Sequence, residues 1–189
     1  MEKFNFIVDV MNNGPIERME SFVHEEFLFF KEYGMQDRGE WLSEIRELVE
    51  SHDRIMMMGH GSPRGLFSVG SFRTNNGYII DESFVDLLRE KKDSVFIWCN
   101  ADQFVDYHGL KGFYTGMFIS EVGEAMYCGL PKTKQPEVDE SNYSFVDIMG
   151  ECINLETKLI HDVVTTRYGH LIEHNPVAEY NHKRLYVNL

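Results

Sequence analysis

The chain has 189 residues, of which 43% are hydrophobic and 13% aromatic, and this is enough apolar material for one sizeable core. We therefore expect a single globular domain over residues 1–189. The 18 basic and 31 acidic residues give a formal net charge of -13, which repels phosphate backbones and anionic membranes and argues against nucleic acid or lipid as a partner.

Other whole-chain features favour the cytoplasm. The beginning of the chain has an acidic second residue and only a short apolar run, unlike a secretory signal. No stretch approaches the roughly 18 uninterrupted apolar residues of a membrane span. Cys99, Cys128 and Cys152 are an odd number of cysteines without the spacing of a disulfide framework. We expect a cytoplasmic protein with free thiols and without a cofactor or metal.

The first third of the chain predicts a strand, two helices and a second strand. Residues 3–11 form an apolar run that the turn-forming sequence NNGP closes. Apolar residues then recur at helical spacing over 16–30 and again over 41–49. The stretch RIMMMG, residues 54–59, is apolar on both faces, which is typical of a central parallel strand.

The middle of the chain continues this alternation. Two short runs flank Asn76-Gly77, a strong hairpin signal. Residues 81–92 predict a helix with an acidic first turn and a basic last turn, and 94–99 predict another buried strand. A helix through 101–114 and a strand over 116–120 should follow.

In the last third, residues 131–142 are polar and predict a loop, and the apolar residues of 145–164 predict one long amphipathic helix. The end of the chain, 175–189, is consistent with an edge strand or a partner-docking tail. Strands that alternate with helices favour an α/β fold, a three-layer sandwich with a mainly parallel central sheet.

Two reactive side chains follow the two most apolar strands. His60 and Cys99 each come just after a strand end, and ligands of open α/β sheets bind beyond the carboxyl ends of the strands. If the two strands are parallel neighbours, which the helix over 81–92 permits, His60 and Cys99 emerge at the same edge. We therefore predict that they lie close together.

This pairing has a chemical rationale. A cysteine is a nucleophile as a thiolate, and its unperturbed pKa is about 8.5. A neighbouring imidazole and the first turn of the helix after Cys99 would stabilise the anion. Gly61 allows a backbone N–H to approach a substrate carbonyl, as an oxyanion-hole donor must.

These residues resemble a known family. A strand that ends in His60-Gly61 and a later apolar strand, VFIWC, that ends in Cys99 resemble the caspase-like cysteine peptidases, which include caspases, gingipains, clostripain, separase and the CHAT peptidases. The segment HGLKGFYTGMFIS, residues 108–120, is also similar to the segment after the CHAT nucleophile. The likeness covers roughly residues 54–150 and implies a caspase-like fold.

The resemblance also implies the roles of the site residues. Cys99 would be the nucleophile that attacks a peptide or protein substrate and forms an acyl-enzyme. His60 would be the acid and base, and the backbone N–H groups of Gly61 and Cys99 would form the oxyanion hole. Many members of the family have a small residue where Trp98 stands, so Trp98 either lines a specificity pocket or marks the loss of peptidase activity.

Three acidic residues lie near the proposed site in the sequence. Asp102, Asp106 and Glu121 would favour a basic residue before the cleaved bond.

Three other interpretations remain open. GHGSPRG, residues 59–65, is a loose glycine-rich phosphate cradle, but an alternating strand replaces the helix that such a loop must open. His170 and His174, with His161 and Glu173 nearby, permit a metal site to be drawn, although no His-Glu-x-x-His motif is present. The chain could also be an inactive caspase-like binding or regulatory module that works with a partner protein or a second copy of itself.

Overall fold

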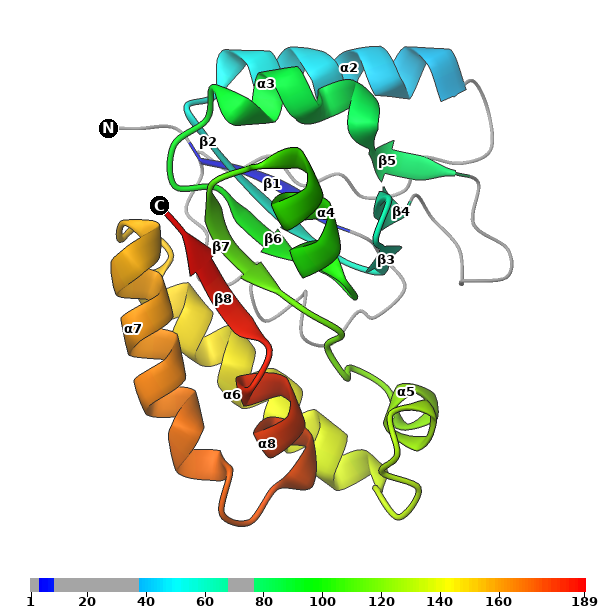
Figure 1. Cartoon of the computed structure of the whole chain (residues 1–189), viewed down its shortest axis with the longest axis vertical. Coiled ribbons are helices and arrows are strands. Elements are labelled where there is room, and N and C mark those ends of the chain that lie inside the picture. Colours follow the sequence, from blue (N-terminus) through cyan, green and yellow to red (C-terminus); the bar gives the residue numbers. More distant parts are fainter. Residues whose placement is uncertain (1–3, 9–37, 68–76) are drawn as a thin grey trace.

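A five-stranded sheet with the order β1-β2-β6-β7-β8 forms the centre of the fold in the computed structural model, which describes residues 4–8, 38–67 and 77–189 (Figure 1). Its strands are β1 (Phe4–Val8), β2 (Arg54–Met58), β6 (Val95–Ile97), β7 (Gly112–Thr115) and β8 (Leu185–Asn188). The first four strands are parallel, and β8 pairs with β7 in the antiparallel direction. The predicted mixed α/β fold with a mainly parallel sheet is confirmed, and the helix expected over 16–30 lies outside the described residues.

Helices pack on both faces of this sheet. One face carries α2 (Arg38–Ser51), α3 (Val85–Arg89) and α4 (Ala101–His108), and the other carries α6 (Gln135–Cys152), α7 (Thr157–Tyr168) and α8 (Pro176–His182). The short helix α5 (Val122–Tyr127) lies at the edge of the molecule, and two 3-10 turns, η1 (Glu82–Phe84) and η2 (Gly169–Leu171), complete the described helical segments. The result is a sandwich of three layers, as expected.

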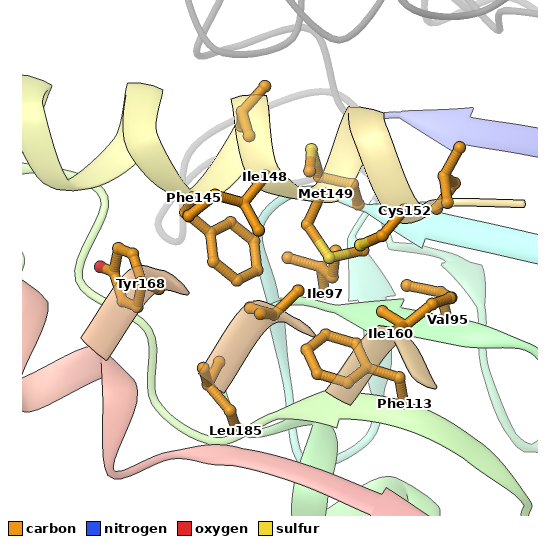
Figure 2. Packing of buried hydrophobic residues seen from close by; sticks show 14 of the residues in the cluster. Val95, Ile97, Phe113, Phe145, Ile148, Met149, Cys152, Ile160, Tyr168 and Leu185 are labelled. Atoms are coloured by element: carbon orange, nitrogen blue, oxygen red, sulfur yellow. The ribbon is translucent and has the colours of Figure 1, made fainter. Parts of the chain in front are cut away.

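The alternation of side chains along β2 explains why residues 55–58 of this strand are all apolar. Ile55 and Met57 join the core on the α2 side, whereas Met56 and Met58 join the core on the α6 side. Neighbouring residues of a strand point to opposite faces, so a strand that is covered on both sides needs apolar residues at every position. Figure 2 shows the second of these cores, where side chains of α6 and α7 meet those of β6 and β7.

The strands that lead to His60 and Cys99 are parallel neighbours. β2 pairs with β6 so that Met58 lies opposite Ile97, and the N–H of Gly59 donates to the carbonyl of Ile97 at 3.0 Å. Both strands therefore end at the same level of the same edge. This part of the sequence prediction is confirmed.

A small antiparallel sheet follows His60 directly. It consists of β3 (Gly61–Ser62), β4 (Gly65–Phe67) and β5 (Tyr78–Ile80). The pairing of β4 with β5 confirms the expected hairpin, although its turn, residues 68–76, lies outside the described residues. Because the glycine-rich stretch 59–65 enters a hairpin rather than a helix, it lacks the helix N-terminus that a phosphate cradle requires.

The predicted boundary between α4 and the next strand is wrong. The helix ends at His108, because Gly109 has the left-handed backbone angle φ 62° that closes a helix. β7 then occupies Gly112–Thr115, so the strand expected over 116–120 starts earlier and residues 116–120 contain no strand.

Two predictions for the last third are also wrong. The expected loop over 131–142 is largely the first part of α6, where the N–H of Lys134 donates to the carboxylate of Glu137 at 2.8 Å and Pro136 fits the first helical turn. The expected single helix over 145–164 is divided into α6 and α7. The break is stabilised by Asp93, whose carboxylate accepts the N–H of Thr157 at 2.8 Å. The edge strand expected near the end of the chain is present as β8.

Within the described ranges, none of the helices combines the length and the apolarity that a membrane crossing needs.

Candidate active site

His60 is fixed at the carboxyl end of β2 by its backbone and by an acidic neighbour. Its carbonyl accepts the N–H of Phe67 at 2.8 Å, which connects it to the hairpin. Its Nε2 lies 3.5 Å from Oε1 of Glu121, the residue that precedes α5. A carboxylate in this position orients the imidazole. Glu121, predicted as a substrate-binding residue, is thus placed beside His60.

Cys99 lies in a sharp turn between β6 and α4. Asn100, which follows it, has the left-handed angles φ 64° and ψ 32°, a conformation that asparagine adopts more readily than most residues. The carbonyl of Trp98 accepts the N–H of Ala101 at 3.2 Å and the hydroxyl of Thr115 at 3.1 Å. These bonds connect the ends of β6 and β7 and hold the turn that carries Cys99.

The thiol of Cys99 is held in its neutral form. Its Sγ donates to the carbonyl of Phe118 at 3.3 Å and lies 3.5 Å from Oε1 of Glu124. Burial raises the pKa of the Cys99 thiol well above its usual value, and the negative charge of Glu124 raises it further. In this arrangement Cys99 is therefore a thiol at neutral pH and not the thiolate that a nucleophile requires.

Glu124 is itself held firmly by the start of its helix. Its second carboxylate oxygen, Oε2, accepts the N–H and the hydroxyl of Ser120, at 2.7 and 3.0 Å, and the N–H of Glu121 at 3.2 Å. Carboxylates satisfy the free N–H groups at the start of a helix in this way. The start of α5 therefore brings the Glu121 carboxylate beside the His60 imidazole and the Glu124 carboxylate beside the Cys99 thiol.

Trp98 packs in the core, and its ring is the reason why position 61 must be glycine. Its side chain is 1% exposed, and its indole N–H donates to the carbonyl of Ser62 at 3.1 Å. A Cβ at Gly61 would lie 2.3 Å from Cδ1 of the Trp98 ring, so only glycine fits there. Because the indole is enclosed by protein atoms, the pocket-lining role predicted for Trp98 is replaced by a packing role that joins the His60 loop to β6.

The predicted acidic residues have different surroundings. The carboxylate of Asp106 accepts the hydroxyl of Tyr114 at 3.0 Å, and burial, together with this bond, raises the pKa of Tyr114 to about 12. Asp102 lies in the first turn of α4, and its Oδ1 has no hydrogen-bond partner among the described residues. Burial raises the pKa of Asp102, and the neighbouring charge of Asp106 contributes to this shift. This oxygen of Asp102 is therefore buried and unpaired within the described part of the chain.

Sequence reasoning missed Glu124 and the carbonyl of Phe118. The pattern SEVGE, residues 120–124, carries the signal of a capped helix start. That signal predicts where α5 begins. It gives no information on the distant side chain that Glu124 contacts, because Cys99 is on a different element.

The histidines near the end of α7 do not form the metal site that can be drawn from the sequence. His170 lies in η2, and Nε2 of His174 lies 3.7 Å from Oε1 of Glu140. In the parts of the chain that the structure describes, no three or more His, Cys, Asp or Glu side chains are grouped so that they could hold a metal ion.

Comparison with models of protein families, with curated proteins and with solved structures finds no match for this chain. The class that the structure defines is an α/β protein with a mainly parallel sheet. The inference of function depends on the geometry at the carboxyl ends of β2 and β6.

Proposed function

We propose that the protein is a caspase-like cysteine endopeptidase with Cys99 as nucleophile and His60 as acid and base. The observation that carries the proposal is the register of β2 and β6, which brings both residues to equivalent positions past the ends of adjacent parallel strands. Side chains that follow the ends of adjacent parallel strands emerge at the same edge of the sheet, as a general base and its nucleophile must. The carboxylate of Glu121 beside His60 adds a third group that orients the imidazole.

The proposed reaction proceeds through an acyl-enzyme. The Cys99 proton passes to His60, and the thiolate attacks the carbonyl carbon of a peptide bond. The C–N bond breaks as His60 returns the proton to the departing amine, and water then hydrolyses the thioester. The backbone N–H groups of Gly61 and Cys99 are proposed to bind the negative oxygen of the intermediate. The reaction requires no cofactor.

We propose further that the substrate has a basic residue before the cleaved bond. Asp102 supports this, since it is an acidic residue in the helical turn that follows Cys99. Glu121 is the second acidic group at this edge.

Replacing Asp102 with asparagine is expected to weaken this preference, because the amide lacks the negative charge. A hydrogen bond to a charged group contributes about 1.5–3 kcal/mol, so kcat/KM for arginine substrates should fall about 10- to 100-fold, while substrates with a neutral residue change little. Paired fluorogenic peptides would measure the ratio. An equal loss for both peptides would contradict the assignment.

A second candidate function is an inactive caspase-like module that binds a partner protein or a second copy of the chain. The neutral thiol of Cys99, which Glu124 and the carbonyl of Phe118 contact, favours it, because a thiol in this form does not attack a carbonyl. The same edge of the sheet would then hold a peptide segment without cutting it.

The two functions are separated by incubating the protein and a Cys99→Ala variant with a diverse peptide library and identifying the products by mass spectrometry. The peptidase predicts cleavage by the unmodified protein alone. Cleavage by both proteins would show that the reaction does not use Cys99. We also propose a cytoplasmic location, where a reducing environment maintains the free thiols of Cys99, Cys128 and Cys152.

A further inference from the structure

We infer that the segment Ser120–Cys128, here called the latch, is an autoinhibitory element whose Glu124 carboxylate holds the Cys99 thiol in a resting state that peptide binding releases. The inference rests on the proposed peptidase function and adds to it a means of control. It follows from contacts that one short segment makes with both members of the proposed dyad.

The latch contacts the two residues through different side chains. Oε1 of Glu124 lies 3.5 Å from Sγ of Cys99, and Oε1 of Glu121 lies 3.5 Å from Nε2 of His60. These contacts have different effects. The carboxylate beside His60 orients the imidazole, whereas the carboxylate beside Cys99 opposes the thiolate because like charges repel.

Other groups near the thiol act in the same direction. Cys128, one helical turn after Glu124, and Tyr180 of α8 both interact electrostatically with Cys99, and each would add negative charge if it ionised. His60, which follows the neighbouring strand β2, is the proposed proton acceptor. The proton of Cys99 therefore stays on sulfur until the Glu124 carboxylate moves away and His60 accepts it.

The latch has fewer buried apolar contacts than the two large cores. Its helix α5 has six residues, and the preceding stretch 116–121 contains no helix or strand. Its apolar contacts belong to one small cluster: Ala125 packs there with Ile119, Val138 and Val177, and the partly buried Val122 and Cys128 pack against it. Met126 and Tyr127 are exposed. Segments with few buried apolar contacts open at low cost compared with the core. Figure 1 shows α5 at the edge of the molecule, connected to the end of β7.

The test measures the reactivity of Cys99 with iodoacetamide as a function of pH, by peptide mapping of the folded full chain. In the unmodified protein the pH at which Cys99 reacts at half its maximal rate, here called the midpoint, should lie well above 8.5, the usual pKa of a thiol. In Glu124→Gln, which removes the charge and retains an oxygen acceptor, the midpoint should fall by about one pH unit and the rate at pH 7.5 should rise about 10-fold.

Glu137→Gln is the matched control, since Glu137 accepts the N–H of Lys134 at the start of α6 in the same manner and lies on another helix. It should leave the Cys99 profile unchanged. A midpoint at or below 8.5 in the unmodified protein, which needs no variant, would overturn the latch, as would an unchanged profile in folded Glu124→Gln.

This readout does not depend on peptide cleavage. An activated thiol in Glu124→Gln without cleavage of any library peptide would support the latch and reject the peptidase. Cleavage by an unmodified protein whose Cys99 has an ordinary or lowered midpoint would support the peptidase and reject the latch.

Discussion

Replacing His60 with alanine is expected to slow peptide cleavage by about 10²- to 10⁴-fold, because the thiol of Cys99 loses the group that accepts its proton. The negative charge of the Glu124 carboxylate beside Cys99 opposes ionisation of the thiol instead of promoting it. The amine that leaves the substrate also loses its proton donor. Initial rates on a library-derived peptide measure the effect on kcat.

His170→Ala is the matched control for this prediction, because His170 is exposed in η2 and belongs to another part of the fold. It should retain full activity. A His60→Ala variant that is folded and cleaves within a few-fold of the unmodified rate would show that another group acts as the base.

Replacing Trp98 with alanine is expected to lower the free energy of unfolding by about 3–5 kcal/mol, the usual loss when a large buried aromatic side chain is removed. The Trp98 ring makes edge-on contacts with Phe96 and Phe104, both at 5.7 Å between ring centroids. Its indole N–H bonds the carbonyl of Ser62, so the hairpin after His60 loses a connection as well. Urea unfolding monitored by circular dichroism gives the change.

Tyr107→Ala provides the comparison for Trp98, since Tyr107 is an aromatic residue of α4 that is 86% exposed. Its substitution should change the unfolding free energy by no more than about 0.5 kcal/mol. A loss below about 1 kcal/mol for Trp98→Ala would contradict the packing role assigned to this side chain.

The strands that build the candidate site could be predicted because their environment leaves a clear pattern. β2 is covered on both faces, so residues 54–58 had to be apolar at nearly every position, and the same holds for β6. Once both were predicted as parallel neighbours, the common edge for His60 and Cys99 followed from topology alone.

Other boundaries could not be predicted, because composition does not distinguish the environments concerned. Residues 116–120 are apolar in the manner of a strand, yet β7 is complete at Thr115 and the chain then turns toward α5. Residues 131–142 are polar in the manner of a loop, yet from Gln135 they form the exposed and capped start of α6. In both places a helix cap or a turn determines the secondary structure, and local composition does not.

The contact between Cys99 and Glu124 was beyond the reach of sequence reasoning for a different reason. It joins a residue of α5 to the turn after β6, two segments that are distant in the sequence, and no periodicity records such a contact. The sequence therefore predicted the position of Cys99 and not the contacts of its thiol. Those contacts leave two proposals to be separated by experiment: an enzyme that is held at rest and a module that binds without cleaving.

The most direct test of the dyad is covalent labelling with a peptide that carries an arginine and a thiol-reactive electrophile in place of the scissile bond. Peptide mapping identifies the modified cysteine in the unmodified protein and in His60→Ala. A side-by-side pair of imidazole and sulfur predicts modification at Cys99 alone, with a rate that falls at least 10-fold when the imidazole is removed. Modification at Cys128, or equal rates at Cys99 in both proteins, would contradict the account.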